Sequence, residues 1–117
     1  MQRYDMSGVR ILLANEPRSY RETLAAAFRI LKPNTSVFVI DPDKLDGEVE
    51  RLSPQLVICS RTTPTVETRS LAWVELYSEH GSVSVVSVGG KRSTIAWIEL
   101  ADLLGVIDRT ESLAKES

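Results

Sequence analysis

Three polar residues that follow two short apolar runs are the first candidates for chemistry. Asn15 and Glu16 come directly after the run at residues 9–14, and Ser60 comes directly after the run at residues 56–59. Glu16 is the only one of the three that brings a negative charge. A serine hydroxyl is a poor nucleophile without a neighbouring base. We therefore expect no nucleophilic role for Ser60.

A second candidate site is the turn Gly89-Gly90-Lys91, which follows another apolar run. A strand, glycines, a lysine and a helix start in series are typical of phosphate-binding loops. The motif is incomplete here, because no glycine stands five residues before Gly90 and Arg92 occupies the Ser or Thr position. Anion binding at the expected helix start is kept as an alternative. The single histidine, His80, is expected at the end of a helix, remote from Ser60.

Apolar runs alternate with segments of helical spacing, and this alternation predicts five strand and helix units in series. The strands are expected at residues 9–14, 37–40, 56–59, 83–88 and 105–107. The first helix is expected between Ser19 and Pro33, and further helices are expected near residues 45–52, over 66–79, over about 93–103 and after 110.

Five such units predict an α/β fold with a parallel sheet covered on both faces, because each crossover connection is right-handed and helical. We expect a three-layer α/β/α sandwich with a five-stranded parallel sheet in the flavodoxin-like order 2-1-3-4-5. In that order Asn15, Glu16 and Ser60 meet at one edge. The 117 residues fit one domain, with residues 1–8 expected as a flexible lead and residues 110–117 as a short or truncated fifth helix.

The composition disfavours several classes of function. Fourteen Lys and Arg against sixteen Asp and Glu give a formal net charge of −2, so direct nucleic-acid binding by this chain is not expected. The only cysteine, Cys59, lies in an apolar run, which favours a buried thiol and a reducing compartment. The sequence has no apolar stretch of membrane-spanning length and no secretory segment at its start. We expect a cytoplasmic location and no membrane partner.

From residue 9 to residue 109 the chain resembles the receiver domain of two-component response regulators, a chemotaxis-protein-like family. The first strand of that family ends in a pair of acids, as in ILLVDDE, and residues 11–17 here read ILLANEP. The third strand commonly reads like PDLVLLD, and residues 54–60 here read PQLVICS. Ser87 matches the Thr or Ser of the fourth strand, and Pro64 matches the proline that commonly follows the phosphorylated loop.

The resemblance implies a degenerate pseudo-receiver that lacks the phosphoacceptor Asp. In the family, three carboxylates hold Mg²⁺, one of them accepts the phosphoryl group, and a lysine at the end of the fifth strand pairs with that group. Asn15, Glu16 and Ser60 stand at the three acidic positions, and either Asp108 or Arg109 stands at the lysine. An acyl phosphate forms only on a carboxylate. The resemblance therefore implies no catalytic residue, no metal and no cofactor.

Each of these residues also has a plain structural interpretation. Asn15 and Glu16 can end a strand and cap the next helix, and Ser60 can be a small loop residue kept for fit. Trp97, expected in the fourth helix, can be a packing residue or an interface anchor. Receivers commonly use the face of the fourth helix, the fifth strand and the fifth helix for partners, so the resemblance favours an interface for Trp97.

Our first hypothesis is a non-catalytic, receiver-like signalling domain that acts by protein–protein interaction, independently of Asp phosphorylation. It would regulate an attached or partner output module, with a protein partner or a homodimer expected. The alternative hypothesis is a small phosphotransfer or anion-binding enzyme that uses Cys59, Ser60 or the Gly89-Gly90-Lys91 turn. A third hypothesis is modification of Ser60 by a separate serine kinase.

Overall fold

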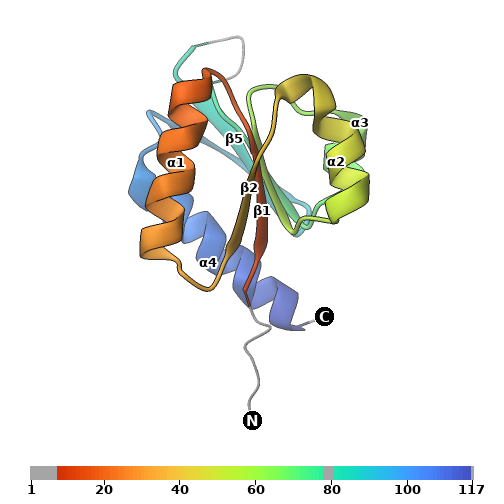
Figure 1. Ribbon diagram of the computed structural model, residues 1–117. Coiled ribbons are helices and arrows are strands. Elements are labelled where there is room, and N and C mark those ends of the chain that lie inside the picture. The colour runs from red at the N-terminus through yellow and green to blue at the C-terminus, as the bar shows by residue number, and fades with distance from the viewer. Residues whose placement is uncertain (1–7, 78–80, 117) are drawn as a thin grey trace.

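The computed structural model describes residues 8–77 and 81–116. Figure 1 shows three layers, with helices α1 (Arg18–Leu31) and α4 (Leu100–Glu116) on one face of a sheet and helices α2 (Leu45–Leu52) and α3 (Pro64–Arg69) on the other. A 3-10 turn, η1 (Pro42–Lys44), leads into α2. The α/β class and the layered arrangement expected from the sequence are confirmed.

The sheet, within the described residues, has six strands in the order β2-β1-β3-β4-β5-β6. The first four positions are parallel and hold β2 (Ser36–Val39), β1 (Arg10–Ala14), β3 (Leu56–Cys59) and β4 (Ala72–Glu75). The last two hold β5 (Val83–Val88) and β6 (Lys91–Ala96), which are antiparallel to their neighbours. The expectation of five parallel strands in the order 2-1-3-4-5 is therefore wrong beyond β2-β1-β3.

The strand β1, which lies between β2 and β3, is buried on both faces, and this explains its unbroken apolar run. Ile11 and Leu13 pack against Leu24 and Phe28 of α1 and the apolar residues of α4. Leu12 and Ala14 point to the opposite face, into a second cluster with residues of α2, α3 and β4. The two clusters fix the sheet between its helices and so fix the edge where β1 and β3 end.

The helix expected over residues 66–79 is divided into a short helix and a strand. The Oγ1 of Thr63 accepts a hydrogen bond from Val66 N at 3.1 Å and caps α3. Ser70 has an extended backbone, with φ −100° and ψ 138°, and ends that helix. Trp73 and Val74 then alternate between the two core clusters as members of β4. This segment forms a strand and not a helix, because its alternating side chains are buried on both faces of the sheet.

The carboxyl-terminal part also differs from the expectation, because the chain reverses where a helix was expected to begin. Gly89 and Gly90 have φ values of 59° and 86° and form a two-residue turn, so residues 91–96 pair with β5 instead of starting a helix. The strand expected at residues 105–107 is helical, and residues 110–116 continue the same helix instead of forming a fifth one. The buried residues of α4 recur at helical spacing: Leu103, Val106, Ile107 and Thr110.

The lead expected over residues 1–8 lies outside the described residues except for Gly8. His80 also lies outside them. No helix within residues 8–77 and 81–116 combines the length and the apolar character that a membrane span requires.

The turn at Gly89 and Gly90 gives a stability prediction. In Gly89→Ala the new Cβ would lie 2.5 Å from Leu113 Cδ2 at a φ of 59°, so we expect a loss of about 2 kcal/mol in the free energy of unfolding. Gly90→Ala meets no atom within 4 Å, and only its φ of 86° should cost about 1 kcal/mol. The exposed Gly47 of α2 is the control, since Gly47→Ala should gain about 0.5 to 1 kcal/mol. Urea denaturation measures all three, and equal effects at Gly89 and Gly47 would refute the turn.

Candidate functional site

Polar residues gather where β1, β2 and β3 end. Asn15 and Glu16 follow β1, Asp41 lies just past β2, and Ser60 follows β3. The Glu16 N–H donates a hydrogen bond of 2.8 Å to Ser60 Oγ, which joins the two central loops. The structure thus places Glu16 and Ser60 side by side, with the hydroxyl oxygen of Ser60 used as an acceptor for the backbone.

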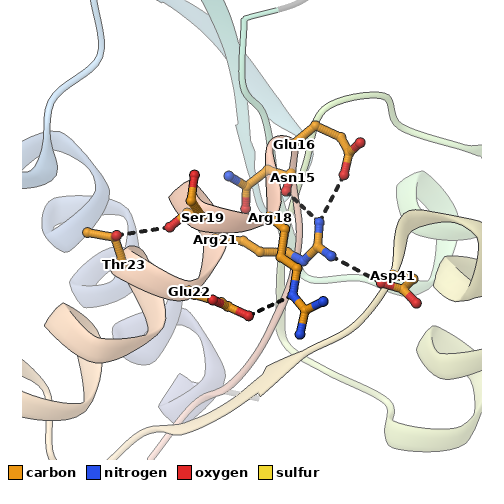
Figure 2. A network of polar contacts seen from close by, with 8 residues as sticks. All are labelled: Asn15, Glu16, Arg18, Ser19, Arg21, Glu22, Thr23 and Asp41. Carbon is orange, nitrogen blue, oxygen red and sulfur yellow. Dashed lines mark hydrogen bonds and ion pairs between the residues drawn. The ribbon is translucent and has the colours of Figure 1, made fainter.

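The centre of this group is Arg21, whose side chain is only 3% exposed. Its Nη1 donates to Asn15 O at 3.1 Å and to Glu16 Oε2 at 2.9 Å, and its Nη2 donates to Asp41 Oδ1 at 3.1 Å. Figure 2 shows the guanidinium reaching from α1 toward both carboxylates. The two carboxylates are 60% and 63% exposed. A desolvated cation is therefore compensated by two anions that keep much of their hydration.

The sequence analysis did not identify Arg21 and Asp41 as site residues, although the position of Arg21 in the sequence indicates that it is unusual. It stands at helical spacing from Leu24, Ala25 and Phe28, which form the buried side of α1. A charged residue in an apolar stripe is rarely buried unless it is paired. Asp41 has no comparable signal, because a single acid before Pro42 is typical of an ordinary turn.

Asn15 contributes its backbone rather than its side chain to this group. Its side chain is fully buried, and neither Nδ2 nor Oδ1 has a hydrogen-bond partner among the described residues. Figure 2 shows the amide pointing away from the carboxylate of Glu16. The side-chain oxygens of Asn15 and Glu16 therefore do not converge as the ligands of one cation would.

A crevice of about 360 Å³ lies on the α2 side of this edge, and its lining includes Glu16, Cys59, Ser60 and Arg61. The thiol of Cys59 is 1% exposed and contacts Val74 O at 3.7 Å. Burial, with a smaller contribution from the nearby Glu75, raises the pKa of Cys59 from 9.0 to about 12. The thiol is thus protonated at neutral pH, which removes its use as a nucleophile.

Three residues expected in the same pocket lie elsewhere. Ser87 pairs with Trp73 near the start of β4, whereas the carboxyl end of β4 lies beside Cys59, because β5 runs antiparallel. Asp108 and Arg109 belong to α4, where Asp108 forms an ion pair with Lys32. The expectation that one of them stands at the end of a fifth strand, where receiver domains carry a lysine, is wrong, because that segment is part of α4.

Asp108 and Arg109 instead line a groove of about 420 Å³ together with Gly89 and Lys91. Val88 and Leu113 supply its apolar wall. Within the described residues, neither Lys91 nor Arg109 has an ion-pair partner. The Gly89-Gly90-Lys91 turn leads into β6, so the helix start expected there is absent. Anion binding at this turn stays a prediction.

Trp97 does not lie in a helix. It follows β6 with a φ of 55°, and it is 72% exposed. Its N–H donates to Ser82 O at 2.9 Å, which continues the β5–β6 pairing by one residue. The described ranges contain no group of three or more His, Cys, Asp or Glu residues placed to hold a metal ion.

Comparisons with known proteins do not identify the chain. No family model matches it, and no curated protein sequence matches it. Among solved structures, it is similar to glycinamide ribonucleotide transformylase 1 from Symbiobacterium toebii, with 10% sequence identity and a TM-score of 0.37 over 96% of this chain and 86% of that chain. A likeness at this TM-score carries no argument about the fold or the function.

The charge arrangement around Arg21 predicts an asymmetry between variants. Glu16→Gln combined with Asp41→Asn leaves a buried cation without compensation, and we expect a loss of about 2 to 3 kcal/mol in the free energy of unfolding. Arg21→Met leaves two exposed carboxylates that water can hydrate, and we expect a loss of about 1 kcal/mol. Urea denaturation at pH 7 measures both. Glu22→Gln, in the exposed pair with Arg18, is the control and should change stability by about 0.5 kcal/mol or less. An Arg21→Met loss as large as that of the double variant would contradict this account.

The Cys59 thiol should resist iodoacetamide in the folded protein and react fully in denaturant. Because its pKa is raised to about 12 in the folded state, the thiol of the unfolded chain ionises first as the pH rises above 9.0. The stabilisation is complete below that pH and should fall by up to about 1.4 kcal/mol per pH unit between the two values. In Cys59→Ala this fall in the free energy of unfolding between pH 9 and pH 12 should be absent, and urea unfolding of both proteins at several pH values measures the difference. Rapid alkylation of the folded chain at pH 8 would show that the thiol is accessible.

Proposed function

We propose that this chain is a non-catalytic signalling domain, receiver-like and flavodoxin-like in its first half, which acts by protein–protein contact without phosphorylation of an aspartate. The observation that carries the proposal is the internal pairing of the groups where β1 and β3 end. Ser60 Oγ accepts the Glu16 N–H at 2.8 Å, and the Glu16 carboxylate binds Arg21 at 2.9 Å. The groups that a phosphorylation site would use are thus engaged with one another.

The electrostatics favour a static site over a metal-dependent one. A divalent cation at Glu16 would have to displace or approach a guanidinium that already neutralises this carboxylate. Two like unit charges about 4 Å apart near a protein surface repel by about 4 kcal/mol, and this repulsion disfavours a cation beside Arg21. The cation that a receiver recruits from solution is supplied here by Arg21, permanently and from within the chain.

Contact surfaces are then the means by which such a domain would act on an attached or partner output module. The carboxyl end of β4 and the segment after β6 carry exposed apolar side chains: Tyr77 at 39%, Trp97 at 72% and Leu100 at 38%. Large aromatic residues of this kind dominate binding energy where they become buried in an interface. A protein partner or a second copy fits this surface, and the lone buried thiol of Cys59 favours the cytoplasm.

A second candidate function is the binding of a small anion in the groove beside the β5–β6 turn. It is favoured by Lys91 and Arg109, which share the groove and are not engaged in ion pairs in the described part of the chain. Catalysis by Cys59 is disfavoured, because burial raises the pKa of its thiol to about 12. An anion that binds without Mg²⁺ and is lost in Arg109→Ala would favour this candidate over the first.

The proposal is tested by adding Mg²⁺ with acetyl phosphate or beryllofluoride to the full chain. We expect no gain of a phosphoryl group by intact-mass measurement and no saturable, Mg²⁺-dependent change in tryptophan fluorescence, because position 60 offers no carboxylate. Ser60→Asp is the matched variant, and a response in it alone would trace the lack of activity to that position. A Mg²⁺-dependent response of the natural chain would refute the proposal.

A further inference from the structure

The strand β6 presents an open edge of the sheet. Its register pairs Lys91 with Val88 across the two-residue turn, and Trp97 N donates to Ser82 O at the other end. Hydrogen bonding alternates along an antiparallel strand, so residues 91, 93 and 95 bond to β5 and residue 97 bonds to Ser82 just before it. The N–H and C=O groups of Arg92, Thr94 and Ala96 therefore point away from β5, and no group among the described residues pairs with them.

The two edges of the sheet are protected unequally. At the β2 edge, Arg29 Nη2 donates to Val37 O at 2.8 Å and occupies an outward carbonyl. Native edge strands are commonly blocked by prolines, bulges or charges along the strand. The stretch from Ser93 to Ala96 has no proline and no charge, and its residues are exposed or half-buried. The β6 edge is thus available for pairing with another strand.

We propose that β6 pairs antiparallel with β6 of a second copy of this chain, about a two-fold axis at Thr94. The inference rests on the proposed function, in which the chain acts through contact with another chain. Only outward-facing residues can exchange hydrogen bonds, so Thr94 must face Thr94 of the second copy and Arg92 must face Ala96. This register makes about six backbone hydrogen bonds and joins the two sheets into one.

The side chains of β6 are complementary to themselves in this register. Lys91 of each copy faces Trp97 of the other, so an unpaired ammonium lies against an exposed indole at both ends. Thr94 faces Thr94, which is a favourable cross-strand pair, and no two like charges stand opposite each other. Arg92 keeps its existing contacts, at 2.8 Å to Glu67 and 5.1 Å above the ring of Trp73.

A second copy of this chain matches β6 better than an unrelated strand, because the pattern of its side chains has two-fold symmetry. The basic end and the aromatic end of β6 are at opposite ends of the strand, and only an antiparallel copy matches both at once. The arrangement also explains why a tryptophan stands at a φ of 55° with most of its surface in solvent. Glycine adopts that backbone conformation with less strain. The indole of Trp97 therefore offsets this strain by its contact with Lys91 in the dimer.

The first test measures the mass of the full chain in solution over a range of concentrations by sedimentation. We expect a monomer–dimer equilibrium that Lys91→Glu and Trp97→Lys each weaken by about tenfold or more in Kd. Combining the two variants restores an opposite-charge pair at both ends, and we expect dimerisation to return and to become salt-sensitive. Because Lys91 and Trp97 are exposed, we expect each variant to fold, and circular dichroism checks this.

The second test reads the register directly. Thr94→Cys places one thiol of each copy beside the two-fold axis. The two Cα atoms of residue 94 are then about 5.5 Å apart, a distance that a disulfide spans. We expect this variant to form a cross-linked dimer under mild oxidation, and we expect Ser93→Cys, which faces Ile95 of the second copy, to remain uncross-linked. Cys59 is 1% exposed and does not compete.

The outcomes separate this inference from the proposed function. A natural chain that stays monomeric at every concentration, or a dimer that ignores Lys91→Glu and gives no Thr94→Cys cross-link, overturns the β6 pairing. Both results leave the absence of Mg²⁺-dependent phosphorylation standing. A chain that dimerises as expected but takes up a phosphoryl group would overturn the proposed function and leave the pairing in place.

Discussion

The buried guanidinium of Arg21 is the constraint on which the edge where β1, β2 and β3 end depends. A cation at 3% exposure cannot be left without anions, so Glu16 and Asp41 are held beside it although both reach into solvent. Because Glu16 is held, its N–H lies against Ser60 Oγ. One charge on α1 therefore ties together the loops that follow β1, β2 and β3. The ion pairs add little net stability by themselves, but their loss is costly, and this asymmetry fixes the geometry.

The same constraint assigns different roles to the two halves of the sheet. The parallel strands β2, β1 and β3 carry the paired charges at their ends, where groups that bind one another have little left to offer a ligand. Within the described residues, the antiparallel hairpin of β5 and β6 and the residue after it carry groups that have no partner: a strand edge, the ammonium of Lys91 and the indole of Trp97. The β5–β6 hairpin extends the sheet beyond β4, so the edge of β6 lies on the opposite side of the sheet from β2 and the Arg21 cluster. The proposed contact with a second copy is therefore separated in space from the Arg21 cluster.

The sequence predicts the first half of this fold well, because its signals agree with one another there. The runs of β1 and β3 are apolar on both faces, and Leu24 and Phe28 mark a clear helical stripe. The second half fails where two periods compete. Trp73 lies at helical spacing from Val66 yet alternates as a strand residue, and Val106 and Ile107 have strand-forming side chains yet complete the stripe of α4 with Leu103. The turn at Gly89 and Gly90 was recognised as a turn, but its φ values, which decide between a hairpin and a helix start, are not written in the residue types.

The candidate site at the ends of β1 and β3 is likewise predictable only where the sequence signals agree. Glu16 and Ser60 meet because they end neighbouring parallel strands, a relation that strand order predicts. The prediction places Ser87 wrongly because the sequence does not show that β5 runs antiparallel to β4. It places Asp108 and Arg109 wrongly because the sequence does not show that residues 100–116 form one helix. Arg21 could have been found, since a charge in a buried stripe demands partners, whereas Asp41 becomes meaningful only once β2 lies beside β1.

Two aromatic residues with left-handed backbones show how the chain balances stability against contact. Tyr77 and Trp97 have φ values of 50° and 55°, and each conformation costs about 1 to 2 kcal/mol in a residue with a side chain. For Tyr77 the compensation is internal, because its N–H donates to Ser84 Oγ at 3.1 Å and its hydroxyl donates to Ile98 O at 3.4 Å. The indole of Trp97 has no such bond in the described part of the chain. Its backbone is fixed by Ser82 O, so the strain is retained while the side chain remains in water. No hydrogen bond of the indole offsets this strain within the described residues, and this difference between Tyr77 and Trp97 fits the proposed pairing of β6 with a second copy.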